Sequence, residues 1–72
     1  MESIFVDFNN TDTESRVRLI VNGTLRDLET KNIVLTAGMK LLLDDDQELK
    51  AIGTVEFSET ENVWVATIEW ID

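Results

Sequence analysis

The chain contains no histidine, cysteine, proline or tyrosine. Without histidine it has no imidazole base that titrates near neutral pH, and without cysteine it has no thiolate nucleophile and no disulfide. Zinc sites built from Cys and His are excluded for the same reason. The remaining candidate reactive groups are carboxylates, hydroxyls and lysines, and no histidine is present to activate a serine. We therefore expect a non-catalytic protein without a cofactor.

Positive charge is also scarce. Six Lys and Arg stand against fifteen Asp and Glu, which gives a net charge of −9. Nucleic acids and anionic membrane surfaces attract an excess of Lys and Arg, so we expect neither as a partner. The longest apolar runs, such as Leu41–Leu43, are too short to span a bilayer. The missing cysteine framework and the absence of a basic leader sequence predict a cytoplasmic protein.

Hydrophobic residues make up 43% of the 72 residues, close to the composition of folded domains. A chain of this length has room for one hydrophobic core, so a single small β domain is expected over residues 1–72. Period-two alternation of apolar and polar residues predicts strands at about residues 3–8, 16–21, 39–43, 49–57 and 63–70. The segment Thr24–Glu29 has apolar residues three apart instead. It predicts a short helical segment near residues 24–30, with Thr24 as N-cap and Asp27 in the capping-box position.

The pairing of the last two strands can be tested by asking which register collects apolar residues on one face. A four-residue loop at Ser58–Glu61 sets Val55 opposite Trp64 and leaves one face wholly apolar, whereas a five-residue loop mixes both faces. The predicted core face consists of Met39, Leu41, Leu43, Leu49, Ala51, Val55, Phe57, Trp64, Ala66, Ile68 and Trp70. Both tryptophans are therefore expected to be buried. Gly53, in the middle of a strand, indicates a bulge or a bend where the sheet curls.

The segment Gly38-Met39-Lys40-Leu41, an acidic turn, Gly53-Thr54-Val55, a hairpin and then Trp64–Ile68 resemble the strand–hairpin core of SH3-like small barrels. The resemblance covers roughly residues 36–70 and is a fold-level pattern. It implies an all-β protein, a small five-stranded SH3-like barrel or compact sandwich with the one short helical segment. The chain departs from peptide-binding SH3 domains because it has no tyrosine and its tryptophans lie on the predicted core face. No aromatic groove for proline-rich ligands is therefore expected.

The turn Asp44–Glu48 carries three consecutive aspartates, which could hold Ca²⁺. If Asp44 is taken as the first position of an EF-hand loop, Leu49 stands at the glycine position and Val55 at the bidentate glutamate position, so that template fails. A solvated hairpin turn is the preferred interpretation, and the sequence leaves open whether the turn binds a cation.

The best lead to function is the face opposite the predicted core. Its apolar members are Leu42, Ile52, Val63 and Val65, with Lys40 and Lys50 beside them. Clustered exposed apolar residues mark interaction sites, so we expect a small acidic protein-binding or adaptor module whose partner is another protein or a second copy of itself. Alternatively, the N-terminal strand or the 24–30 segment covers this face.

A second interpretation is an acidic inhibitor that mimics nucleic-acid phosphates in a basic protein site. Its candidate carboxylates are Asp44, Asp45, Asp46, Glu48, Glu56, Glu59 and Glu61.

Overall fold

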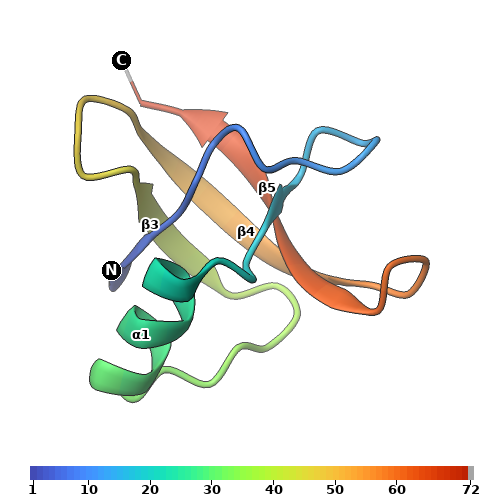
Figure 1. Cartoon of the computed structure of the whole chain (residues 1–72), viewed down its shortest axis with the longest axis horizontal. Coiled ribbons are helices and arrows are strands. Elements are labelled where there is room, and N and C mark those ends of the chain that lie inside the picture. Colours follow the sequence, from blue (N-terminus) through green and yellow to red (C-terminus); the bar gives the residue numbers. More distant parts are fainter. Residues whose placement is uncertain (72) are drawn as a thin grey trace.

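The protein folds as a curled five-stranded sheet with one helix at its edge (Figure 1). The structure is a computed structural model that describes residues 1–71. Its elements in chain order are β1 (Ser3–Phe5), β2 (Val17–Arg18), α1 (Asn22–Thr30), β3 (Lys40–Asp44), β4 (Lys50–Ser58) and β5 (Val63–Trp70). The strand order is β1-β3-β4-β5-β2, with β1 parallel to β3 and the other neighbours antiparallel. The predicted all-β class with five strands and one short helix is confirmed, in the form of a half-barrel.

Both hairpins of β3, β4 and β5 pair two residues away from the predicted register. Val55 lies opposite Ala66 instead of Trp64, and Leu43 lies opposite Ala51 instead of Leu49. A shift of two residues keeps every side chain on its face, so the predicted division into two faces holds although the predicted partners are wrong. In the hairpin of β4 and β5, the observed register is set locally by Asn62. Its φ of 61° is a left-handed conformation that asparagine tolerates, and it closes a loop over residues 59–62.

The concave side of the half-barrel holds the core. The buried side chains there are Ile4, Val6, Val17, Leu19, Leu41, Leu43, Ala51, Val55 and Ala66. No bulge interrupts the sheet at Gly53, which pairs in register with Leu41 and Ile68. A Cβ at Gly53 would lie 2.7 Å from Cδ1 of Leu43, so glycine stands here because a core side chain packs directly against the backbone.

Helix α1 and its C-cap residue Lys31 close the outer edge of β1 with three side chains. The Phe5 N–H donates to Oδ2 of Asp27 (2.7 Å), and Oγ1 of Thr24 donates to the Phe5 carbonyl (2.6 Å). One helical turn further on, Nζ of Lys31 donates to the Ser3 carbonyl (2.6 Å). Residues three and four apart share one face of a helix. This face of α1 therefore supplies the hydrogen bonds that a neighbouring strand would otherwise make with an edge strand.

The predicted capping box is wrong. The helix begins at Asn22, its N-cap position is Val21, and no side chain caps it. Thr24 and Asp27 lie inside the helix and bond to β1 instead of to the helix terminus. Gly23 permits this close approach, because a Cβ there would lie 2.5 Å from the Phe5 ring.

The opposite edge of the sheet is covered by the chain itself. Thr11 forms an isolated antiparallel bridge with Val17, and the Arg18 N–H donates to the Asn10 carbonyl (2.9 Å). Residues 10–12 thus lie along the outside of β2. The strand is shorter than predicted because the chain turns after Leu19 and enters α1.

We expect Thr24→Val to destabilise the protein. Valine keeps the shape of this fully buried side chain but removes the hydroxyl that donates to the Phe5 carbonyl. Loss of such a hydrogen bond costs about 1–2 kcal/mol, which corresponds to several degrees in Tm for a domain of this size. Thr30→Val, an exposed position of the same helix, is the matched control and should change stability by less than about 0.5 kcal/mol. Equal Tm values for the two variants would contradict the edge-closing role.

Candidate functional site

The structure divides the predicted interaction face into two separate parts. Leu42 and Ile52 lie directly opposite each other on the convex face of β3 and β4, and both are half-buried. The exposed residues Lys40 and Lys50 lie on either side of them. Nζ of Lys40 donates to Oγ1 of Thr54 (2.8 Å), while Nζ of Lys50 lies 4.0 Å from a carboxylate oxygen of Asp44. The apolar part of this surface is therefore a single pair of side chains between two engaged lysines.

Val63 and Val65 lie at the other end of the sheet. Val65 is opposite Glu56 on β4, four residues from Ile52, which is a distance of about 13 Å along a strand. It is fully buried, with Arg18 of β2 as its neighbour on the other side. Val65 is thus covered from the β2 side and takes no part in an open surface, while Val63 is half-buried opposite Ser58.

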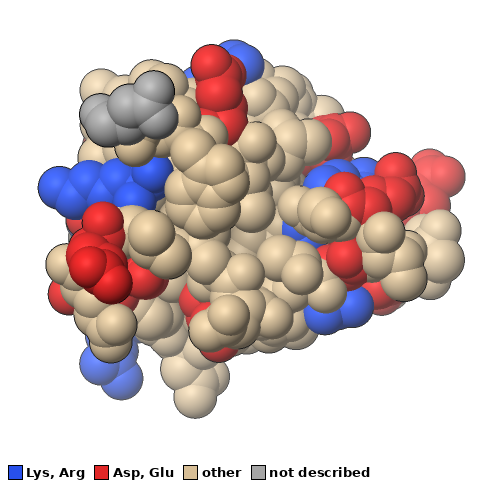
Figure 2. Space-filling model, turned by 90° about the horizontal axis from the view of Figure 1, so that it is seen from above, with Lys and Arg blue, Asp and Glu red and all other residues tan. Residues whose placement is uncertain are grey.

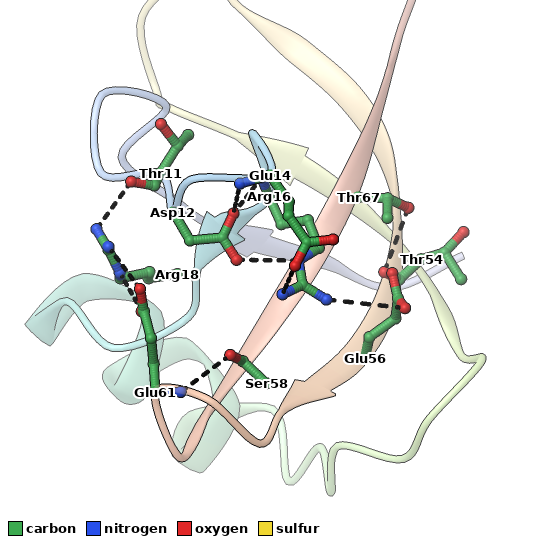
Figure 3. Close-up of polar contacts among 10 residues, drawn as sticks. All are labelled: Thr11, Asp12, Glu14, Arg16, Arg18, Thr54, Glu56, Ser58, Glu61 and Thr67. Atoms are coloured by element: carbon green, nitrogen blue, oxygen red, sulfur yellow. Dashed lines mark hydrogen bonds and ion pairs between the residues drawn. The ribbon is translucent and has the colours of Figure 1, made fainter.

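An ion-pair network at this end of the sheet joins the turn before β2 to β4 and to the β4–β5 loop (Figure 3). Nε of Arg16 bonds to Oδ2 of Asp12 at 2.9 Å, and its two Nη atoms lie 3.2 Å from Glu14 and 3.9 Å from Glu56. The Asp12 side chain is only 3% exposed. Its Oδ1 also accepts the backbone N–H groups of Glu14 and Arg16, both at 2.9 Å. One carboxylate therefore holds together the turn that covers the edge of β2.

Arg18 ties the same turn to the β4–β5 loop. Its Nε and Nη2 form a two-point contact with the Glu61 carboxylate at 2.6 and 3.0 Å. Nη1 donates to the Asn10 side chain and to the Thr11 carbonyl. The hydrogen bond from Arg18 lowers the pKa of the Glu61 carboxyl below its ordinary value. Glu56 and Glu61 are thus engaged by arginines, which argues against a free row of carboxylates that imitates phosphates.

The turn Asp44–Glu48 uses its carboxylates to bond its own backbone. Oδ1 of Asp45 accepts the N–H groups of Gln47, Glu48 and Leu49 at 3.0, 3.2 and 3.1 Å. The hydrogen bond from the Gln47 N–H is the largest cause that lowers the pKa of Asp45. Within residues 1–71, no group of three or more acidic side chains is arranged to hold a metal ion. The turn is therefore built by Asp45 as a hydrogen-bond acceptor.

One exposed apolar surface lies elsewhere, at the end of the concave face. Trp70 is 53% exposed and Leu49 is 43% exposed, and at the other end of β4 Phe57 is 40% exposed. The expectation that these three side chains lie in the core is therefore wrong. The Trp70 ring is tilted against that of Phe8, with centroids 4.8 Å apart. Trp70 pairs with Ala51 of β4. Leu49 lies two residues before Ala51, just ahead of β4, and is therefore within reach of the large Trp70 side chain. We call Phe8, Leu49 and Trp70 the mouth patch.

Sequence periodicity placed Leu49 and Trp70 on the correct face but carried no signal for where the core ends. Trp64, on the same face of β5, is half-buried and packs against the core. Trp70 lies farther along β5, beyond the two residues that pair with β2, and Phe8 stacks on it from one side. In the observed register β2 pairs only with Val65 and Ala66, and even the predicted strand at 16–21 would end opposite Thr67. Among the described residues, Trp70 therefore has no strand beside it on that side of β5.

An open depression of about 330 Å³ adjoins the mouth patch. It is lined by Phe8 and Leu49 of the patch and by Phe5, Val6, Asp7, Asn9, Val21, Asp45 and Gln47. Its charged lining residues, Asp7 and Asp45, are both acidic. Figure 2 looks onto the end of the molecule where β5 ends, and it shows a central uncharged area with Asp and Glu side chains around it and Lys or Arg side chains next to them. This end of the protein thus combines the apolar mouth patch with a depression whose charged lining residues are acidic.

These features define a small half-barrel β protein with an apolar mouth patch beside an acidic depression. Comparison with protein-family models, with curated proteins and with solved structures gives no match. Among the described residues, no helix has the length and apolar character that crossing a membrane requires. Function must therefore be argued from the surface itself.

We expect the stability of the protein to fall at acidic pH in a way that depends on Asp12. The Arg16 N–H, the Glu14 N–H and the Arg16 guanidinium lower the pKa of this carboxyl in the folded state. The unfolded chain therefore takes up the proton at a higher pH than the folded one. The stabilisation is present above the ordinary Asp pKa of about 4 and is lost as the pH falls through the lower folded value.

Urea-unfolding midpoints at neutral and acidic pH measure this effect. Asp12→Asn removes the charge. The urea midpoint of this variant should therefore change less between neutral and acidic pH than the midpoint of the wild type does. Asp46→Asn, at an exposed position of the β3–β4 loop, is the matched control and should keep the wild-type difference. An unchanged difference in Asp12→Asn would show that other carboxylates cause the acid sensitivity.

Proposed function

We propose that the protein is a non-catalytic binding module that recognises another protein through the mouth patch. The observation that carries this proposal is the exposure of Trp70, which is stacked on Phe8 beside the exposed Leu49. Tryptophan is among the residues that most often dominate the energy of protein–protein interfaces. The outward pair Leu42 and Ile52 is the weaker candidate, since both are half-buried and bordered by engaged lysines.

The charge distribution indicates the character of the partner. The chain has a net charge of −9, and the depression beside the patch has two acidic and no basic lining residues. A partner surface with an apolar centre and Lys or Arg at its border is complementary to this arrangement, and like-charged surfaces are repelled. Long-range attraction between such surfaces accelerates association and weakens as salt screens it.

The test compares the wild type with Trp70→Ala and Val34→Ala in capture from source-cell lysate. Val34 is 76% exposed between α1 and β3 and is the matched control for loss of an exposed apolar side chain. We expect wild type and Val34→Ala to retain the same protein, and Trp70→Ala to bind it at least about 10-fold more weakly. The retained protein should carry a basic surface and bind more slowly at high salt.

Circular dichroism on Trp70→Ala separates loss of binding from loss of folding. Because about half of the Trp70 surface is already exposed, truncation should cost less than the ~3–5 kcal/mol typical of a buried tryptophan. The same proteins retained by all three forms, or none retained by the wild type, would contradict the proposal.

A further inference from the structure

The far edge of β5 is covered over only part of its length. β5 pairs with β4 from Val63 to Trp70, but β2 pairs only with Val65 and Ala66. One additional bond, from the Leu19 N–H to the Trp64 carbonyl (3.0 Å), extends this cover toward the start of β5. No strand lies beyond β5 from Ile68 to Trp70 among the residues that the structure describes.

The register shows which backbone groups face this open edge. The Ile71 N–H donates to the Lys50 carbonyl (3.3 Å), so residue 71 directs its backbone groups toward β4. Because these directions alternate along an antiparallel strand, Glu69 also bonds toward β4, whereas Ile68 and Trp70 direct their N–H and C=O groups away from it. The Leu19–Trp64 bond agrees with this alternation. Within residues 1–71, no hydrogen bond from outside β4 reaches the backbone of Ile68 or Trp70.

The two other sheet edges are treated differently. Two side chains of α1 and its C-cap Lys31 bond to the edge of β1, and residues 10–12 lie along β2. Both edges are thus closed to a further strand, as is usual for edges that must not pair. The short edge at Ile68–Trp70 has neither form of cover and borders the exposed Trp70 ring.

We infer that this edge accepts an extended segment of a partner protein as an additional strand, with alternating basic and apolar residues. The inference rests on the proposed function and specifies how the partner is held. Residues opposite each other in a ladder place their side chains on the same face. A partner residue opposite Trp70 therefore contacts the mouth patch and is apolar, while the residue opposite the exposed Glu69 is basic. Backbone bonds supply affinity and the alternate side chains supply specificity, as in other strand-addition complexes.

A second copy of this chain is a poor occupant of the edge. Antiparallel self-pairing that uses the free groups of both Ile68 and Trp70 sets each residue 68 opposite residue 70 of the other copy. Glu69 then lies directly opposite Glu69, and like charges in that position are destabilising. Each copy also carries a net charge of −9. The charge pattern therefore selects a basic segment over a homodimer.

The probe is an acetylated and amidated heptapeptide of alternating Lys and Val, titrated into the ¹⁵N-labelled full chain. In antiparallel pairing that sets the valines opposite Ile68 and Trp70, the valine N–H groups face β5 and the lysine N–H groups face solvent. The peptide N-methylated at its valines should bind at least about 10-fold more weakly than the parent, and the one N-methylated at its lysines should bind like the parent. A heptapeptide of alternating Glu and Val should bind at least about 10-fold more weakly. These changes correspond to about 1.4 kcal/mol or more.

Hydrogen exchange in the bound state locates the pairing. Saturating peptide should slow exchange at the Ile68 and Trp70 amides at least about 10-fold and leave those of Thr67 and Glu69 unchanged, because the latter already bond to β4. Three results would overturn the inference. The peptide could bind without slowing amide exchange at Ile68 and Trp70, both N-methylated peptides could lose the same affinity, or no binding could be detected at about 1 mM peptide. A cellular partner that depends on Trp70 but leaves these amides unprotected would refute strand addition and retain the proposed function. Strand addition by the peptide without any cellular partner that depends on Trp70 would support the edge as a strand acceptor and refute the proposed function.

Discussion

The closure of the β1 edge by α1 is the contact on which the rest of the sheet depends. β1 is three residues long and has only β3 as a strand neighbour. Its Phe5 backbone would face solvent without the hydrogen bonds that its N–H donates to Asp27 and its carbonyl accepts from Thr24. Because β1 carries Ile4 into the core and leads to Val6 and Phe8, fixing its position also fixes one wall of the concave face. The Phe8 ring that supports Trp70 thus depends on a helix at the far side of β1.

The acidic composition is accommodated by local hydrogen bonding. Asp12 organises the turn over β2, Asp45 organises the β3–β4 loop, and Glu61 is held by Arg18. In each case the carboxylate accepts N–H groups, and its pKa is lowered as a result. These carboxylates therefore have structural partners. Asp45 also lines the depression beside the mouth patch, together with Asp7, whose side chain accepts the Asn9 N–H.

The two ends of the sheet differ because β2 pairs with β5 only at Val65 and Ala66. Where β2 pairs with β5, Val65 is fully buried and Val17 and Ala66 belong to the core. Beyond that pairing, Trp70 is exposed, and among the described residues β4 is the single strand neighbour of β5 at Ile68 and Trp70. An incomplete barrel thus leaves an apolar ring and a free backbone edge at the same place. That coincidence is the structural reason for assigning recognition to this end of the molecule.

Alternation of residue types was sufficient to predict the all-β class, the short helix and the face on which each side chain of β3, β4 and β5 lies, because one face of a sheet must be buried. Turn conformation and hydrogen bonds between distant residues decided the register of the strands and the roles of individual side chains. Alternation is unaffected by a shift of two residues, so the left-handed Asn62 and the Asp45 turn set the pairing. The roles of Thr24 and Asp27 depend on Phe5, about twenty residues away in the chain. Local patterns cannot report contacts over that separation, nor the point on a strand at which its neighbour ends. Tertiary structure alone therefore buried Val65 and exposed Trp70.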